Sequence, residues 1–189
     1  MNRSASAGAA RVRYTGPAIA LHWLIAVGLA GSFVLGLYMH DLPLSPAKLQ
    51  LYAWHKWAGI TLFMLVWARL AWRLGHPPPP LPATMPARLR SAAAAAHGLL
   101  YVLMLAIPVS GWLMSSAKGV PTVWFGVVPL PDLVSRDKAL GDLLATTHQA
   151  LNFTLLGLIV AHAGAALKHH FVDRDDVLTR MLPGGAANK

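Results

Sequence analysis

Four long apolar stretches, separated by short segments rich in proline and charge, set the pattern of this chain. They cover about residues 17–39, 54–74, 92–114 and 143–167. Each is close to the roughly 20 residues that an α-helix needs to cross a hydrocarbon core of about 30 Å. The strands of a membrane barrel would alternate apolar and polar residues over about ten positions, and these stretches do not alternate. The pattern therefore predicts an all-α protein, an integral membrane antiparallel four-helix bundle.

The connections between the predicted helices are too short to hold a second domain. Residues 40–52 contain two prolines, and residues 75–90 contain the run Pro77 to Pro80, a stiff extended spacer. The longest connection, about residues 115–142, contains three more prolines. We therefore expect residues 1–189 to form a single membrane domain, with a kink at Pro108 in the third helix.

Composition narrows the class of protein further. The chain is 56% hydrophobic and only 12% charged, whereas a soluble domain is about 25% charged. Its net charge of +9 comes from 16 Lys and Arg against seven Asp, with no Glu. Nucleic-acid-binding proteins are not this apolar, so we assign the basic excess to a membrane surface. The absence of cysteine excludes disulfides, Cys-ligated zinc, iron–sulfur clusters and thioether-attached haem.

The distribution of basic residues predicts the orientation. Eleven lie in the two tails and around the second connection: Arg3, Arg11, Arg13, Arg69, Arg73, Arg88, Arg90, Lys168, Arg174, Arg180 and Lys189. Five lie around the other two connections: Lys48, Lys56, Lys118, Arg136 and Lys138. The positive-inside rule then places both termini in the cytoplasm, in a multi-pass protein of a bacterial inner membrane. A cleaved signal peptide is the alternative for the first stretch, which is longer than the 7–15 residues typical of that segment.

Because the chain has no cysteine, its histidines are the main remaining candidates for metal or redox chemistry. A polar ring in the hydrocarbon region is costly unless it is paired or ligating. Four histidines lie inside the predicted spans close to the membrane faces, His22, His55, His148 and His162, and His97 joins them at the start of the third span. His148 and His162 are fourteen residues apart, so they share one helix face at a separation of about 21 Å along the axis. One ring therefore lies near each membrane surface.

Histidines that lie at the same depth in the membrane can be paired across the bundle, and we call this depth matching. His22 matches His162 on the cytoplasmic side, and His55 matches His148 on the outer side. Two six-coordinate haems b, each held by two imidazoles from facing helices, need this arrangement. A small residue follows three of these histidines by four positions: Ala26 after His22, Gly59 after His55 and Ala166 after His162. These residues leave room for a macrocycle, although small residues also let membrane helices pack closely.

Two other interpretations of the histidines stay open at this point. They could be polar side chains satisfied within the bundle, or they could form a site for transported zinc or copper. Such metal sites usually add carboxylate or sulfur ligands, and the predicted spans contain neither Glu nor Cys. Two haems therefore fit the residues better.

Several motifs together resemble the prokaryotic cytochrome b561 family of four-helix, di-haem membrane proteins. The resemblance covers nearly the whole chain, in residues 20–24 (ALHWL), 55–59 (HKWAG), 69–73 (RLAWR), 77–79 (PPP), 97–111 (HGLLYVLMLAIPVSG), 148–162, 169–171 (HHF) and 178–181 (LTRM). It implies haem ligation by the same four histidines that depth matching selects. It also implies a quinone-linked electron carrier, and one activity in the family is superoxide oxidation with ubiquinone as electron acceptor.

Other residues are candidates for supporting roles. Arg69 and Arg73, four residues apart on one helix face, suit haem propionates or lipid headgroups. His97 suits a propionate, a quinone site or the membrane interface, and His169 competes with His162 as a ligand. Lys56 could steer an anion towards the outer haem. An interfacial belt is expected of five tryptophans: Trp23, Trp54, Trp57, Trp112 and Trp124.

Three functions remain after these observations. The first is a superoxide:quinone oxidoreductase, in which superoxide is oxidised on the periplasmic side and electrons pass to ubiquinone. The second is a cytochrome b subunit that carries electrons between quinol and a redox protein such as a hydrogenase or dehydrogenase. The third is a haem-free structural or transport protein, which predicts colourless membranes. The expected partners are membrane lipid, a quinone, and superoxide or a redox protein, with no nucleic acid.

Overall fold

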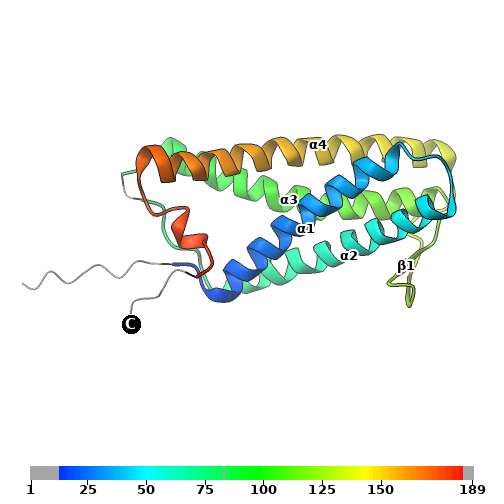
Figure 1. The fold of residues 1–189 in the computed structure, drawn as a ribbon, viewed down its shortest axis with the longest axis horizontal. Coiled ribbons are helices and arrows are strands. Elements are labelled where there is room, and N and C mark those ends of the chain that lie inside the picture. The colour runs from blue at the N-terminus through cyan, green and yellow to red at the C-terminus, as the bar shows by residue number, and fades with distance from the viewer. Residues whose placement is uncertain (1–12, 83, 185–189) are drawn as a thin grey trace, which may run out of the picture.

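Four long helices lie side by side in an elongated antiparallel bundle in the computed structural model, which describes residues 13–82 and 84–184 (Figure 1). They are α1 (Gly16–His40), α2 (Pro46–Gly75), α3 (Ala87–Ala117) and α4 (Lys138–Lys168). By length and composition, all four can cross a membrane. The predicted four-helix membrane bundle is therefore confirmed. The limits of the spans within these helices, and the single domain over residues 1–189, stay predictions.

The two ends of the bundle differ in structure. At one end, here called the terminal end, the Tyr14 amide donates to the Arg180 carbonyl (3.4 Å), so the two ends of the described chain meet. The opposite end, here called the hairpin end, carries two short antiparallel strands, β1 (Thr122–Trp124) and β2 (Val128–Leu130). The sequence analysis did not predict this hairpin, which occupies part of the connection between α3 and α4.

Local signals explain where the helices begin and end. The Ser45 hydroxyl accepts from the Lys48 amide (3.2 Å) at the start of α2, and the following proline needs no hydrogen bond there. The Asp137 carboxylate accepts from the Leu140 amide (3.0 Å) at the start of α4. α2 ends just before the proline run because proline cannot continue a helix. α3 continues through Pro108, and the kink expected there stays a prediction.

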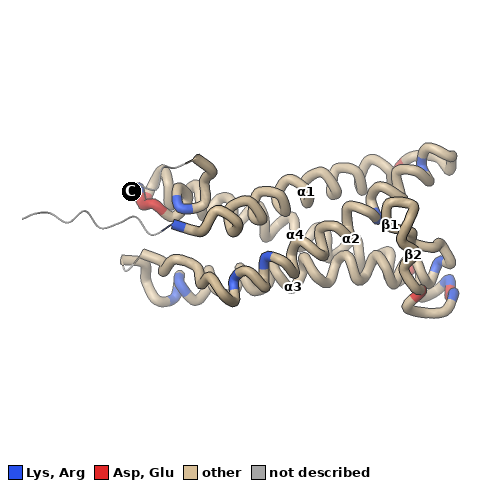
Figure 2. The backbone as a smooth tube through the Cα atoms, turned by 90° about the horizontal axis from the view of Figure 1, so that it is seen from below, with Lys and Arg blue, Asp and Glu red and all other residues tan. Residues whose placement is uncertain are grey.

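Charged residues gather towards the two ends and leave the middle of the bundle without charge (Figure 2). In α2, for example, no charged residue lies between Lys56 and Arg69. The terminal end carries most of the Lys and Arg, and Asp residues lie at both ends, among them Asp173 at the terminal end and Asp142 at the hairpin end. Arg3, Arg11 and Lys189 of the predicted cytoplasmic set lie outside the described residues.

The apolar core lies between α3 and α4 at mid-height. Its buried members are Leu100, Leu103, Ile107 and Leu155. Leu155 is seven residues from both His148 and His162, so this core separates the depths of the two histidines on α4. The level between these two histidines is therefore packed with apolar side chains.

Candidate functional site

The structure contains two pairs of histidines, and within each pair the two rings face each other across the bundle. Near the hairpin end, His55 of α2 and His148 of α4 have ring centroids 6.3 Å apart and ring planes at 82°. Near the terminal end, His22 of α1 and His162 of α4 also have centroids 6.3 Å apart, with planes at 61°. The structure thus brings together the same two pairs that depth matching in the sequence selects.

Hydrogen bonds orient the rings of the hairpin-end pair. His148 Nδ1 lies 2.9 Å from the Ser110 hydroxyl and 3.1 Å from the Ile107 carbonyl. Because a carbonyl only accepts, the second contact needs the proton on Nδ1 and leaves Nε2 as a free acceptor. His55 Nδ1 lies 3.3 Å from the Ser32 hydroxyl. Partners of this kind fix the orientation of histidines that bind metal ions.

Two glycines give these rings their space. A Cβ at Gly111 would lie 3.1 Å from Cε1 of His148, and one at Gly36 would lie 3.3 Å from Cε1 of His55. These distances are tighter than ordinary van der Waals contact, so the ring would have to move. The sequence analysis selected Gly59 and missed both positions, although Gly111 lies in one of the motifs that carried the family resemblance.

The terminal-end pair has a third histidine beside it. The ring of His97, from α3, lies 5.2 Å from the ring of His162, with planes at 71°. The Arg69 side chain is close to the same group. It donates to the Ala18 carbonyl (2.6 Å) and to the Tyr101 hydroxyl (3.0 Å). Four helices therefore contribute to this end of the site.

Arg73, the second arginine candidate, differs from Arg69 in its exposure. It lies one helical turn further towards the terminal end and is exposed, whereas Arg69 is half-buried. It is close enough to His97 for a Coulomb effect on that ring. The roles of both arginines at a propionate or quinone stay predictions.

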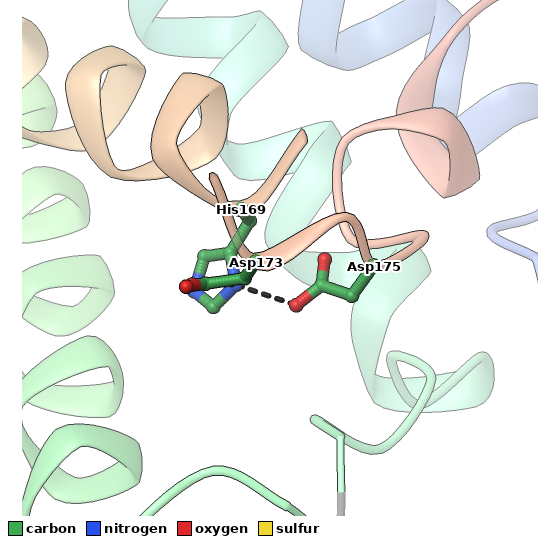
Figure 3. A group of neighbouring side chains, drawn as sticks. All are labelled: His169, Asp173 and Asp175. Carbon is green, nitrogen blue, oxygen red and sulfur yellow. Dashed lines mark hydrogen bonds and ion pairs between the residues drawn. The ribbon is translucent and has the colours of Figure 1, made fainter. Parts of the chain in front are cut away.

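His169 lies in a group of its own with two carboxylates (Figure 3). Its Nδ1 is 2.6 Å from Asp175 and 3.3 Å from Asp173. Lys168 also pairs with Asp173, at 2.7 Å. These contacts use a ring nitrogen of His169 to hold the segment after α4, a role that differs from the competing ligand expected from its position two turns after His162.

That C-terminal segment folds across the terminal end. It contains a π-helical turn (His169–Asp173) and a short 3₁₀ helix (Thr179–Met181). Arg180 donates to the Pro80 carbonyl (2.7 Å) and pairs with Asp176 (2.7 Å). Trp23, which was predicted to lie in an interfacial belt, donates from its indole to the Met181 carbonyl (2.8 Å). The segment therefore ties α1 to the proline run between α2 and α3.

We predict that Arg180→Ala loosens this segment. The substitution removes charge-assisted bonds worth about 1.5–3 kcal/mol, so amides in residues 179–182 should exchange with deuterium roughly ten to a hundred times faster. Hydrogen exchange followed by mass spectrometry measures this. Arg88→Ala, at an exposed position in the first turn of α3, is the matched control. Equal exchange in both variants would contradict the anchoring role of Arg180.

Known proteins with similar sequences identify the family. The family model described as Prokaryotic cytochrome b561 matches residues 13–184. The chain is 41% identical over 172 residues to Cytochrome b561 homolog 2 of Escherichia coli (strain K12), and the aligned region covers 90% of this chain and 91% of that protein. It is 30% identical over 129 residues to Probable superoxide oxidase CybB of Yersinia pestis, and the aligned region covers 68% of this chain and 73% of that protein. The chain therefore belongs to the prokaryotic cytochrome b561 family, whose members are haem b-binding membrane proteins that transfer electrons.

Proposed function

We propose that the protein holds two haems b, and that His22 and His162 would bind the iron of one while His55 and His148 would bind the iron of the other. The observation that carries this proposal is the 6.3 Å spacing of the ring centroids in both pairs. Two metal–nitrogen bonds of about 2 Å, with about 1 Å from each nitrogen to its ring centre, require a spacing of about 6 Å. The 5.2 Å between His97 and His162 is shorter than this, which favours a supporting role for His97.

The surroundings of the rings also fit haem. The Nδ1 contacts of His55 and His148 leave the Nε2 atom of each ring available to a ligand between them. A Cβ at Gly59, one turn after His55, would meet no atom within 4 Å in the described part of the chain. The donor set, imidazoles without thiolate or carboxylate, is one that haem iron accepts in electron-transfer proteins.

The protein's own contribution is to hold and separate the two centres. Haem iron, when bound, supplies a reversible one-electron change. Ser32, Ser110 and the Ile107 carbonyl hold the hairpin-end imidazoles in one orientation. The core around Leu155 keeps water out between the pairs, at a separation of about 21 Å along α4. Arg69, Arg73 and His97 are proposed to bind propionate or quinone at the terminal end.

The reaction that we propose is superoxide:quinone oxidoreduction in a bacterial inner membrane, with both termini in the cytoplasm. Two superoxide ions each lose one electron on the hairpin side and become O₂, and ubiquinone takes up the two electrons and two protons to give ubiquinol. The similarity to the Yersinia pestis protein named as a probable superoxide oxidase supports this donor. Basic residues at the hairpin end, such as Arg136, would attract the anion.

Charges at the hairpin end moderate that attraction. Asp142 pairs with Lys138 (2.8 Å) and lies 3.8 Å from Lys118. Lys48 and Lys56 donate to backbone carbonyls, which leaves their charge in place. The attraction of superoxide by these exposed charges should weaken as salt is added, because salt screens them.

The test is to supply superoxide to the purified protein in liposomes that contain ubiquinone. We expect reduced b-haem absorption to appear at once and ubiquinol to accumulate at one per two superoxide ions. Addition of superoxide dismutase should abolish both signals. A spectrum that superoxide leaves unchanged would remove this activity. Copurification with a hydrogenase or dehydrogenase would then favour the alternative, a cytochrome b subunit that carries electrons between quinol and that partner.

A further inference from the structure

The hairpin and the residues beside it form an apolar segment that has no charged side chain of its own. Residues 119–131 contain no charged side chain. Three large apolar side chains at and after the turn are exposed: Phe125 (55%), Val127 (78%) and Val128 (45%). Water would be an unfavourable environment for apolar side chains gathered on so short a segment.

Hydrogen bonds fix the hairpin to the side of α2. Lys56 donates to the carbonyls of Val120 (3.2 Å) and Pro121 (3.1 Å). Trp57 donates from its indole to the Val123 carbonyl (2.7 Å). These two residues follow His55 directly in the chain, so the position of the hairpin is coupled to the outer histidine pair. The hairpin projects sideways from the bundle rather than beyond its end (Figure 1).

Tryptophan side chains mark the level of the hairpin. Trp124 donates to the Thr61 hydroxyl (3.3 Å), and Trp112 donates to the Pro131 carbonyl (3.0 Å). Indoles with an apolar body and a hydrogen-bonded N–H are typical of the membrane–water interface. Trp54, on the same turn of α2 as Trp57, is 47% exposed. The hairpin is therefore continuous with the lipid-facing surface of the helix.

The turn itself carries an unusual residue. Phe125 and Gly126 both have positive φ, +49° and +73°, in the turn between the paired residues Trp124 and Val128. A bulky residue such as Phe125 is strained at positive φ, where glycine is favoured. The Phe125 ring lies 5.2 Å from the Trp57 ring and 5.1 Å from the Trp124 ring, but more than half of the side chain stays exposed. A strained, exposed aromatic side chain of this kind is unfavourable in water.

We propose that the β1–β2 hairpin inserts into the headgroup region of the membrane leaflet at the hairpin end, with Phe125, Val127 and Val128 against the acyl chains. Its paired strands limit the number of backbone groups that would lack hydrogen bonds, and at interfacial depth water and headgroups satisfy the rest. Through Lys56 and Trp57 the inserted hairpin anchors the segment of α2 that carries His55. The partner is the lipid surface itself, not a second protein.

Site-directed spin labelling tests the insertion directly, because the chain has no native cysteine. Val127→Cys is labelled, the protein is placed in phosphatidylcholine vesicles, and collisions of the label with oxygen and with a water-soluble nickel chelate are measured. Ser135→Cys, exposed on the same connection, gives the aqueous reference. Val160→Cys, 64% exposed on α4, gives the reference inside the hydrocarbon.

We expect the oxygen-to-nickel ratio at residue 127 to be several times that at residue 135 and to lie below that at residue 160. A ratio at residue 127 equal to that at residue 135 would overturn insertion. Low accessibility to both reagents would overturn it as well, because it would indicate that a protein covers the hairpin. Phe125→Cys provides an independent second position at which the same outcomes apply.

Discussion

Replacing His22 or His55 with alanine is expected to leave the purified protein with one b haem per chain in place of two. Each substitution removes one proposed haem ligand from a pair whose ring centroids are 6.3 Å apart, and the remaining pair is separated from it by the core around Leu155. The double variant should retain no haem. A pyridine haemochrome assay counts haem per chain, and a dithionite-reduced minus oxidised spectrum shows which component is lost.

Two other histidines provide controls for this experiment. His97→Ala removes the ring beside His162 and should leave two haems, with at most a shift in the spectrum of the terminal-end haem. His40→Ala removes an exposed histidine that pairs with Asp41 at 2.9 Å and should change nothing. A protein in which His22→Ala and His55→Ala both keep two haems would refute the ligand assignment.

Replacing Gly111 with valine is the second change with a large expected effect. Even the Cβ of the new side chain would lie 3.1 Å from the His148 ring, and the added methyl groups must displace that ring from its contacts with Ser110 and Ile107. Overpacking of this kind typically costs about 1–3 kcal/mol. We expect the hairpin-end haem to be lost or weakly held, while the terminal-end haem is retained.

Gly98→Val is the matched control for Gly111→Val. Gly98 lies on the same helix, and a Cβ there would meet nothing within 4 Å in the described part of the chain. Both variants carry the same modest cost of a β-branched residue in a helix, so any difference in haem content comes from the contact with His148. If the two variants held equal amounts of haem, Gly111 would have no part in shaping the site.

The order and depth of the helices could be read from the sequence because both are local properties. An apolar run of about 20 residues crosses a bilayer whatever lies beside it, and the excess of Lys and Arg predicts which side each connection takes. His148 and His162 are fourteen residues apart, which is nearly four turns of an α-helix, so the two residues lie on one helix face. These properties were enough to select the histidine pairs that the structure brings together.

Rotation of the helices and contacts between distant segments were decided only by the tertiary structure. A shift of one position along a helix turns a side chain by about 100°, so sequence spacing within one helix does not reveal which residue of another helix it meets. The contacts of Ser110 and Gly111 with His148 cross from α3 to α4, and that of Ser32 with His55 crosses from α1 to α2. The contact of the hairpin with α2 has the same origin, because its hydrogen bonds join residues 63 to 66 positions apart. The sequence thus determined the depth of each histidine in the bundle, whereas packing between the helices decided what surrounds it.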